Sequence, residues 1–158
     1  MTRHPQAIRD GEARPPKLSI VEVESLIDVH FPQAHTGGKL MFLETLGDRF
    51  ARIRLQAHDR ILRPGNTVSG PAMFLLADYG TYATLLGTLG EGALQAVTSS
   101  LNMTFLQRPE AQGMIADITI IKLGRRVAVA EIEIYSDARD DMVAHAVASY
   151  ALPPGNER

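Results

Sequence analysis

The chain has 158 residues, 45% of them hydrophobic, which is enough to build the core of one ordinary globular domain. Its formal net charge of -2 argues against a nucleic-acid-binding protein, which usually concentrates basic residues on one face. The sequence has no cysteine, so disulfides, thiolate zinc sites and a cysteine nucleophile are excluded.

The first 17 residues are polar and charged and lack the apolar core of a signal peptide. We expect residues 1–17 to be disordered or loosely attached and residues 18–158 to form a single domain. The one long apolar window, 64–90, contains proline, glycines and a central aspartate, so we interpret it as buried protein rather than a membrane span. The expectation is a cytoplasmic protein with no membrane partner.

Residues 19–57 carry a helix signal, a glycine-containing stretch and a strand signal. Ser19 and Glu22 form a capping-box pattern that predicts the start of a short helix, and Pro32 ends it. The stretch 33–47 is interpreted as loop. From 49 to 57 apolar and polar residues alternate, which is typical of a strand.

The segment 71–89 is rich in leucine, alanine and methionine and is too long for a strand. Pro71 suits the first turn of a helix, which at this length would run for about 28 Å. Because the segment is apolar around its whole circumference, we expect the helix to be wrapped on all sides.

Four strand-like runs follow the predicted helix. Their connections contain proline, glycine or aspartate and are short enough for hairpins, so we expect an antiparallel meander. One strand, one long buried helix and a four-stranded meander together predict an α+β fold. The four runs are residues 94–106, 113–123, 126–136 and 142–152.

Asp78 is the one charged residue between Arg63 and Glu91 and lies inside the predicted buried helix. An ionised carboxylate there is costly unless something compensates it. Either Asp78 caps a backbone group or reaches solvent, or it lies in a cleft where it meets a substrate. Gly70, at the start of the same helix, has an N–H with no intrahelical acceptor and a partial positive charge. An acid and an oxyanion donor of this kind are what thioester hydrolysis requires.

The spacing of these two groups has a geometric consequence. Gly70 and Asp78 are eight residues apart, or about 12 Å along a helix. Both groups must approach one carbonyl to within about 3 Å. The simplest arrangement combines Gly70 of one subunit with Asp78 of another, so the sequence predicts an active site at a dimer interface.

From about residue 45 to 153 the chain resembles the hotdog thioesterase superfamily, in particular the phenylacetate-degradation (PaaI) type of acyl-CoA thioesterase. The segments that carry the resemblance are GNTVSGPAMFLLADYGTY (65–82), AVTSSLNMTFLQRP (96–109), KLGRRVAVAEIEIYS (122–136) and MVAHAVASYALP (142–153). The resemblance implies a hotdog fold, in which an antiparallel sheet wraps one long central helix, and a homo-oligomer that is a dimer or a dimer of dimers.

The same resemblance implies hydrolysis of a small or medium acyl-CoA to a carboxylic acid and CoA. Asp78 would be the nucleophile or the general base, and the Gly70 N–H of the neighbouring subunit would be the oxyanion donor. Coenzyme A is then part of the substrate, and no cofactor is expected.

Two positions at the start of the predicted helix, and one further along it, differ from this family pattern. Ser69 stands where the family commonly has histidine, and Pro71 replaces its second glycine. Ser69 remains able to donate a hydrogen bond to the substrate or the loop, but it is not a general base at neutral pH. Tyr82, one helical turn after Asp78, fills acyl space, hydrogen-bonds the acid or is a core aromatic.

Further candidates lie in turns and at a strand start. Asn66 is a candidate for orienting the carbonyl or the attacking water, although backbone preference alone explains a Gly-Asn turn. Thr98 and Ser99 are candidates for lining the acyl pocket. The cations near hairpin ends either bind the phosphates of CoA or are solvated turn residues: Arg108, Lys122, Arg125 and Arg126.

None of the five histidines has the spacing of a metal site, and no nucleophile elbow or phosphate-binding glycine loop occurs. Two other functions stay open. A non-catalytic acyl-CoA-binding hotdog protein would suit the missing histidine and the bulky Tyr82. A hotdog hydratase would need a histidine near the helix, and none occurs between His58 and His145.

Overall fold

The computed structural model describes residues 14–137 and 140–155 of the chain. Six strands form one antiparallel sheet in the order β1-β2-β6-β7-β8-β5, and two short strands, β3 and β4, pair with each other. The elements in chain order are α1 (Ile20–His30), the 3-10 helix η2 (Pro32–His35), β1 (Met41–Gly47), β2 (Phe50–Leu55), the 3-10 helix η3 (Asp59–Ile61), β3 (Leu62–Arg63), β4 (Thr67–Val68), α2 (Gly70–Leu89), the 3-10 helix η4 (Gly90–Ala93), β5 (Val97–Phe105), β6 (Met114–Leu123), β7 (Val127–Ser136) and β8 (Met142–Ala151).

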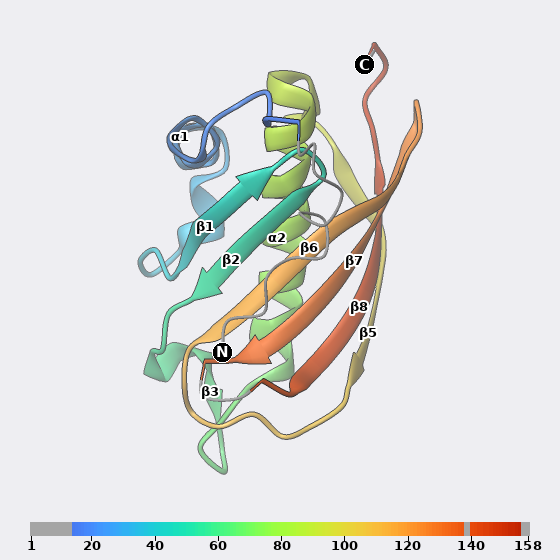
Figure 1. The fold of residues 1–158 in the computed structure, drawn as a ribbon. Coiled ribbons are helices and arrows are strands. Elements are labelled where there is room, and N and C mark those ends of the chain that lie inside the picture. The colour runs from blue at the N-terminus through green and yellow to red at the C-terminus, as the bar shows by residue number, and fades with distance from the viewer. Residues whose placement is uncertain (1–13, 138–139, 156–158) are drawn as a thin grey trace.

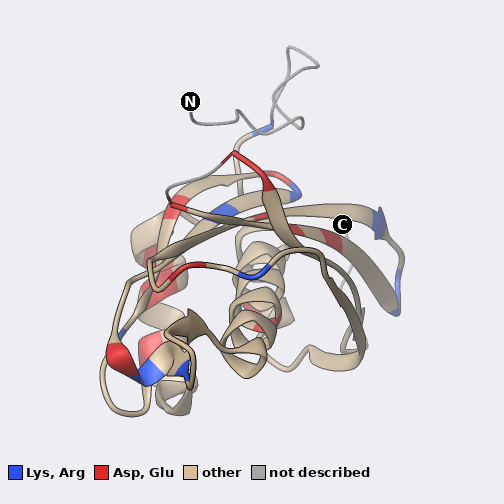
Figure 2. Ribbon diagram, turned by 90° about the horizontal axis from the view of Figure 1, so that it is seen from below, with Lys and Arg blue, Asp and Glu red and all other residues tan. Residues whose placement is uncertain are grey.

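The long helix α2 lies against the inner face of the curved sheet, and α1 packs beside it at the β1 end (Figure 1). Figure 2 views the molecule along α2 and shows the sheet curving around a helix that carries almost no charge. A sheet wrapped around one central helix is the hotdog architecture, so the predicted fold is confirmed.

The sheet approaches α2 most closely where the helix has small residues. A Cβ atom at Gly80 would lie 2.6 Å from Ile118 Cδ1 and 3.2 Å from Ile53 Cγ1. Only glycine allows β2 and β6 to pack this tightly on the helix. From Tyr79 to Leu89 every residue of α2 is buried.

The interpretation of α2 as wrapped on all sides is wrong for its first half. Phe74 and Leu75 are 39% and 49% exposed, and Pro71 is also exposed. With Asp78 these residues recur at i, i+3, i+4 and i+7, so they form one continuous face of the helix. We call Pro71, Phe74 and Leu75 the apolar stripe. The sheet covers the opposite face, whereas the stripe stays partly exposed in the described part of one protomer.

The predicted loop 33–47 is also wrong in part, because β1 occupies Met41–Gly47 and pairs with β2. Met41 and Leu43 face the core, whereas Phe42 between them is 37% exposed. An apolar residue on the solvent face conceals the alternation that usually marks a strand.

The predicted meander is wrong in its order. β5 pairs with β8, and not with β6, whose two edges are occupied by β2 and β7. The eight residues 106–113 connect β5 to β6. They reach up to about 26 Å, whereas three strand spacings need only about 14 Å. A short connection therefore does not require a hairpin, and Figure 1 shows this one passing below β8 and β7.

The start of the described chain is attached to the rest by backbone hydrogen bonds. Lys17 donates to the Gly87 carbonyl at 2.7 Å, and the Arg14 carbonyl accepts from Asp48 at 3.2 Å. The expected disorder of residues 1–13 lies outside the described residues, and the single domain over 18–158 stays a prediction. The predicted capping box is confirmed, since Ser19 and Glu22 each bond the backbone N–H of the other. In the described ranges no helix combines the length and apolarity that crossing a membrane requires.

Candidate active site

Asp78 accepts two hydroxyl hydrogen bonds on one carboxylate oxygen. Tyr150 Oη donates to Asp78 Oδ1 at 2.5 Å, and Thr98 Oγ1 donates to the same oxygen at 2.6 Å. Tyr150 Oη also lies 3.0 Å from the main-chain oxygen of Asp78. Among the described residues, no hydrogen bond or ion pair reaches Oδ2.

The sheet register explains why both hydroxyls reach Asp78. Thr98 in β5 and Tyr150 in β8 are direct cross-strand partners, so their side chains lie on the same face of the sheet, toward α2. A β-bulge follows at once: the register skips Ser99, whose Oγ donates to the Ser149 carbonyl at 3.0 Å. Bulges change the direction of side chains next to active sites.

The surroundings of Asp78 are neutral hydroxyl groups rather than cations. Tyr150 is only 3% exposed, and burial raises the pKa of its phenol, with the hydrogen bond to Asp78 raising it further. Tyr150 therefore stays a protonated donor across the physiological range. Two neutral hydroxyl donors therefore fix the orientation of the Asp78 carboxylate through one of its oxygens.

The start of α2 provides a free backbone N–H. Ser69 is the N-cap, and its Oγ accepts from the Ala72 N–H at 3.2 Å. The Gly70 N–H has no acceptor in the described part of the chain, as expected for the first residue of a helix. A Cβ at Gly70 would lie 3.3 Å from Phe105 Cζ, so glycine lets the Phe105 ring pack closely against the helix start.

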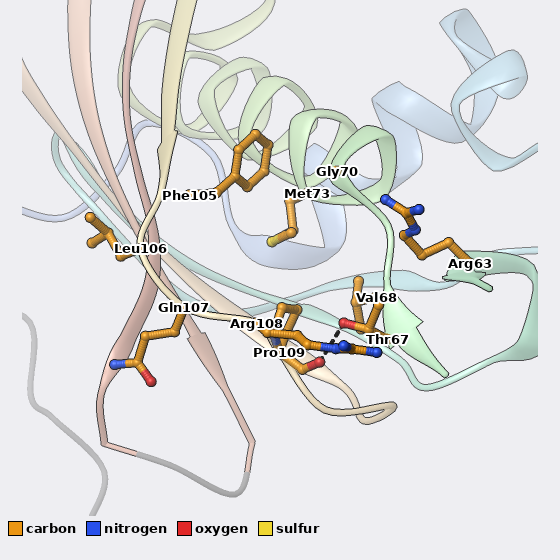
Figure 3. Close-up of a pocket in the computed structure, with 10 residues that line it drawn as sticks. All are labelled: Arg63, Thr67, Val68, Gly70, Met73, Phe105, Leu106, Gln107, Arg108 and Pro109. Atoms are coloured by element: carbon orange, nitrogen blue, oxygen red, sulfur yellow. Dashed lines mark hydrogen bonds between the residues drawn. The ribbon is translucent and has the colours of Figure 1, made fainter. Parts of the chain in front are cut away.

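Two cavities flank this helix start. The first, of about 470 Å³, we call the arginine cavity; Figure 3 shows Met73 and Phe105 on one side and Arg108 on the other. It is lined by Arg63, Thr67, Val68, Gly70, Met73, Phe105, Leu106, Gln107, Arg108 and Pro109. The hydrogen bond from Thr67 Oγ1 to the Pro109 carbonyl, 2.5 Å long, ties β4 to the connection that forms its floor.

The second cavity has a volume of about 320 Å³ and lies on the other side of the helix start, beneath η2. We call it the η2 cavity. Most of its lining is apolar, and Ser69 is shared with the cap of α2. The lining residues are Gln33, Ala34, Thr36, Gly38, Leu40, Met41, Leu55, Arg60, Ile61, Ser69, Pro71, Ala72 and Leu75.

The structure brings Thr98 to Asp78 but leaves other predicted site residues elsewhere. The Tyr82 hydroxyl donates to the Leu94 carbonyl at 2.7 Å, and its ring packs edge-on against Phe31, as in a core aromatic. Asn66 has a φ of 55° in the β3–β4 turn, which agrees with a backbone role. It lines a further polar cavity next to Arg108.

Arg125 and Arg126 are exposed in the β6–β7 hairpin. That hairpin lies at the end of the sheet opposite β3 and the start of α2 (Figure 1). Within one protomer these two residues are therefore not next to Gly70, and a second subunit would have to bring them there.

Sequence reasoning missed Tyr150. The inner face of β8 reads Ala144, Ala146, Ala148 and then Tyr150, all buried. A single large polar side chain at the end of a row of alanines needs a partner for its hydroxyl. That pattern was visible in the sequence, but the partner was not.

Comparisons with known proteins identify the family of the chain. The family model described as the thioesterase superfamily matches residues 65–143, half of the chain. A crystal structure of a proposed thioesterase from Silicibacter sp. TM1040 is 31% identical, with a TM-score of 0.78 over 90% of this chain and 97% of that one. A proposed esterase of Saccharolobus solfataricus is 25% identical over 87% of both chains.

The phenylacetic acid degradation protein PaaI of Escherichia coli shares the fold, with a TM-score of 0.68 at 17% identity over 86% of this chain and 96% of that one. The chain therefore belongs to the thioesterase superfamily. Its class is that of the hotdog thioester hydrolases. Within the described ranges, no group of His, Asp or Glu side chains is arranged to hold a metal ion.

Proposed function

We propose that the protein hydrolyses small or medium acyl-CoA thioesters, with Asp78 as the catalytic carboxylate. The observation that carries the proposal is the asymmetric hydrogen bonding of this residue: Tyr150 and Thr98 both hold Oδ1, and Oδ2 is left without a partner among the described residues. A carboxylate fixed through one oxygen presents the other in a defined direction, which is the preorganisation that catalysis needs.

Two routes suit this arrangement. In the nucleophilic route, Oδ2 attacks the thioester carbon, the C–S bond breaks with loss of CoA thiolate, and water then hydrolyses the mixed anhydride. In the general-base route, Oδ2 takes a proton from a water as that water attacks the same carbon, and the proton ends on the departing thiolate. In both routes the hydrogen bonds to Oδ1 orient Oδ2 for its reaction.

The oxyanion formed in either route needs a donor, for which we propose the Gly70 N–H of a partner subunit. Gly70 and Asp78 of one chain lie about 12 Å apart along α2, too far to meet one carbonyl. Two antiparallel copies of the helix would bring each glycine to the other chain's aspartate.

Two features of the protomer support such a homodimer. The apolar stripe leaves Phe74 and Leu75 exposed on the same face as Asp78. Beside it, β5 is the last strand of the sheet, paired with β8 alone, and carries exposed Val97 and Phe105. An unpaired strand edge next to exposed apolar side chains is typical of a surface that a second chain covers.

The arginine cavity supports an anionic substrate arm. Arg63 and Arg108 line it together with Gly70, and Arg108 Nη2 donates to the Gly65 carbonyl at 2.7 Å. Guanidinium groups bind phosphates through paired N–H donors. We propose that the phosphate-bearing arm of bound CoA extends from the thioester into this cavity. Arg125 and Arg126 of a second subunit are further candidates for binding its phosphates.

The test is release of free thiol from a panel of acyl-CoA esters by wild type and by Asp78→Asn, with Asp48→Asn in the β1–β2 turn as a matched control. Loss of about 10³-fold or more in kcat for Asp78→Asn, with normal turnover by the control, is expected. Normal hydrolysis by Asp78→Asn would refute the role of Asp78. Tight acyl-CoA binding without thiol release by wild type would instead establish a non-catalytic binding protein.

A further inference from the structure

The η2 cavity differs chemically from the arginine cavity on the other side of Gly70. Its floor is made of core residues, with Met41 and Leu55 both 2% exposed, and Ala34 of η2 and Ala72 of α2 also line it. Its polar side chains are Gln33 on η2, Thr36 directly after η2, Arg60 on η3 and Ser69, the N-cap of α2.

We infer that the η2 cavity is the binding site of the acyl group, and that its depth determines which acyl chains the protein accepts. This inference rests on the proposed function for the position of the thioester, since it takes the carbonyl to lie at Gly70. An acyl-CoA is apolar at one end and anionic at the other. Two cavities of matching character, one mostly apolar and one with two arginines, lie on either side of that point.

The position of the η2 cavity on the helix supports the assignment. Pro71 and Leu75 line it and also belong to the apolar stripe, which continues to Asp78. A group bound in the cavity therefore lies beside the face that carries the catalytic carboxylates in the proposed dimer. Ser69, the N-cap of α2, and Pro71 both line the cavity, so its wall includes the residues on either side of Gly70.

The volume of the cavity limits which acyl groups fit in it. Its volume of about 320 Å³ is at the small end of the range for small-molecule sites, roughly 300–1,000 Å³. A short or medium aliphatic chain or a single aromatic ring fits such a space, whereas a long fatty acyl chain would extend beyond it.

Arg60 forms part of the rim of this cavity. Its Nη2 donates to the Gly38 carbonyl at 2.7 Å, and a Cβ at Gly37 would run into the same guanidinium. With a φ of 83°, Gly37 also adopts a backbone conformation that other residues rarely take. The glycine pair thus lets Arg60 lie over the loop and limit the cavity on its solvent side.

The experiment uses alkyl-CoA thioethers, which keep the CoA arm and the chain but are not hydrolysed, with alkyl groups of increasing length. Their dissociation constants are measured by calorimetry on the full-length protein. Each methylene that enters an apolar cavity improves affinity by about fourfold. For wild type, Kd should fall with chain length and then reach a plateau when the cavity is full.

Two variants change the cavity, and one matched variant does not. Ala34→Leu should shorten the chain at which the plateau begins and raise Kd for the longer thioethers by about tenfold, while binding of free CoA stays unchanged. Leu40→Ala should move the plateau to longer chains. Ala57→Leu adds the same side chain at an exposed position that does not line the cavity, and should match wild type.

An unchanged plateau in Ala34→Leu or Leu40→Ala, or a Kd independent of chain length in wild type, would overturn the assignment. So would an equal effect of Ala57→Leu. If Ala34→Leu fails to fold, Leu40→Ala still decides. Because the readout is binding without turnover, the result is separate from that of Asp78→Asn, which tests the catalytic proposal alone.

Discussion

Thr98 and Tyr150 face each other across the β5–β8 ladder and donate hydrogen bonds to the same carboxylate oxygen, at 2.6 and 2.5 Å. The acceptor is Asp78, the one charged residue of α2. Three elements, α2, β5 and β8, therefore meet at one oxygen atom. Thr98 and Tyr150 hold the carboxylate through one oxygen only. Deleting one of the two hydroxyls therefore tests how much these hydrogen bonds matter for catalysis.

Removing the Tyr150 hydroxyl should slow catalysis without unfolding the protein. In Tyr150→Phe the carboxylate keeps only the Thr98 donor and gains rotational freedom, so we expect kcat to fall by about 10- to 100-fold with KM little changed. Steady-state kinetics with one acyl-CoA ester measure both parameters. A lowered kcat with constant KM separates a positioning role from general destabilisation.

Tyr79→Phe is the matched control for that substitution. Tyr79 is also a buried tyrosine, on the same helix as Asp78, and its hydroxyl has no hydrogen-bond partner among the described residues. Its removal should leave kcat unchanged. Equal kinetics for Tyr150→Phe and Tyr79→Phe would show that the hydroxyl at 150 does not position the acid.

Mixing two inactive variants tests whether the active site is shared between subunits. Gly70→Pro removes the N–H of residue 70, and a proline at the first helical position suits the backbone there. Neither Gly70→Pro nor Asp78→Asn alone should hydrolyse acyl-CoA. Co-expressed, half of the dimers would be mixed and would each contain one complete site, so about a quarter of wild-type activity should return. Absence of any recovery in verified mixed dimers would place both groups in one chain.

A charge in the apolar stripe should separate the subunits. Phe74 is 39% exposed, and its ring lies against Phe105, with centroids 6.3 Å apart. Phe74→Glu would bring two like charges together across a twofold interface, so light scattering should show the mass of a monomer, and turnover should be lost.

Val29→Glu on α1 is the control for the stripe, because Val29 is 72% exposed and is not part of the stripe or of β5. It should keep both the oligomer and the activity. A Phe74→Glu variant that remains a dimer with full turnover would place the interface elsewhere.

His35 should make the protein less stable in acid. Burial lowers its pKa from the ordinary value of 6.5, Lys39 lowers it further, and Asp28 and Glu24 act in the opposite direction without cancelling the effect. The unfolded chain then binds a proton that the folded protein resists, so the free energy of unfolding falls as the pH drops through and below 6.5.

His35→Phe should reduce that fall while keeping the edge contact of the ring with Tyr79, 5.5 Å between centroids. Urea denaturation at pH 8 and at pH 5 measures the free energy of unfolding in both proteins. The difference between the two pH values should be smaller in the variant than in wild type. An identical difference would exclude His35 as a source of acid sensitivity.

Local patterns predict a large part of this molecule. The capping box of Ser19 and Glu22, the start of α2 at Gly70 and the strand alternation of β6, β7 and β8 all follow from residue types at short spacing. The strand over residues 41–47 was not predicted, because the exposed Phe42 conceals the alternation of its apolar residues. The pairing of β5 was not predicted correctly, because an eight-residue connection between β5 and β6 allows β5 to pair with either β6 or β8.

The sequence by itself determined that a lone acid, Asp78, follows a glycine by eight residues on one apolar helix, a separation of about 12 Å that makes a site shared between two chains the simplest prediction. Only the tertiary structure decided what holds that acid. Tyr150 lies 72 residues beyond Asp78, and it reaches Oδ1 because β5 pairs with β8 at the edge of the sheet. Strand order results from packing over the whole chain, and no short-range pattern encodes a contact at that separation.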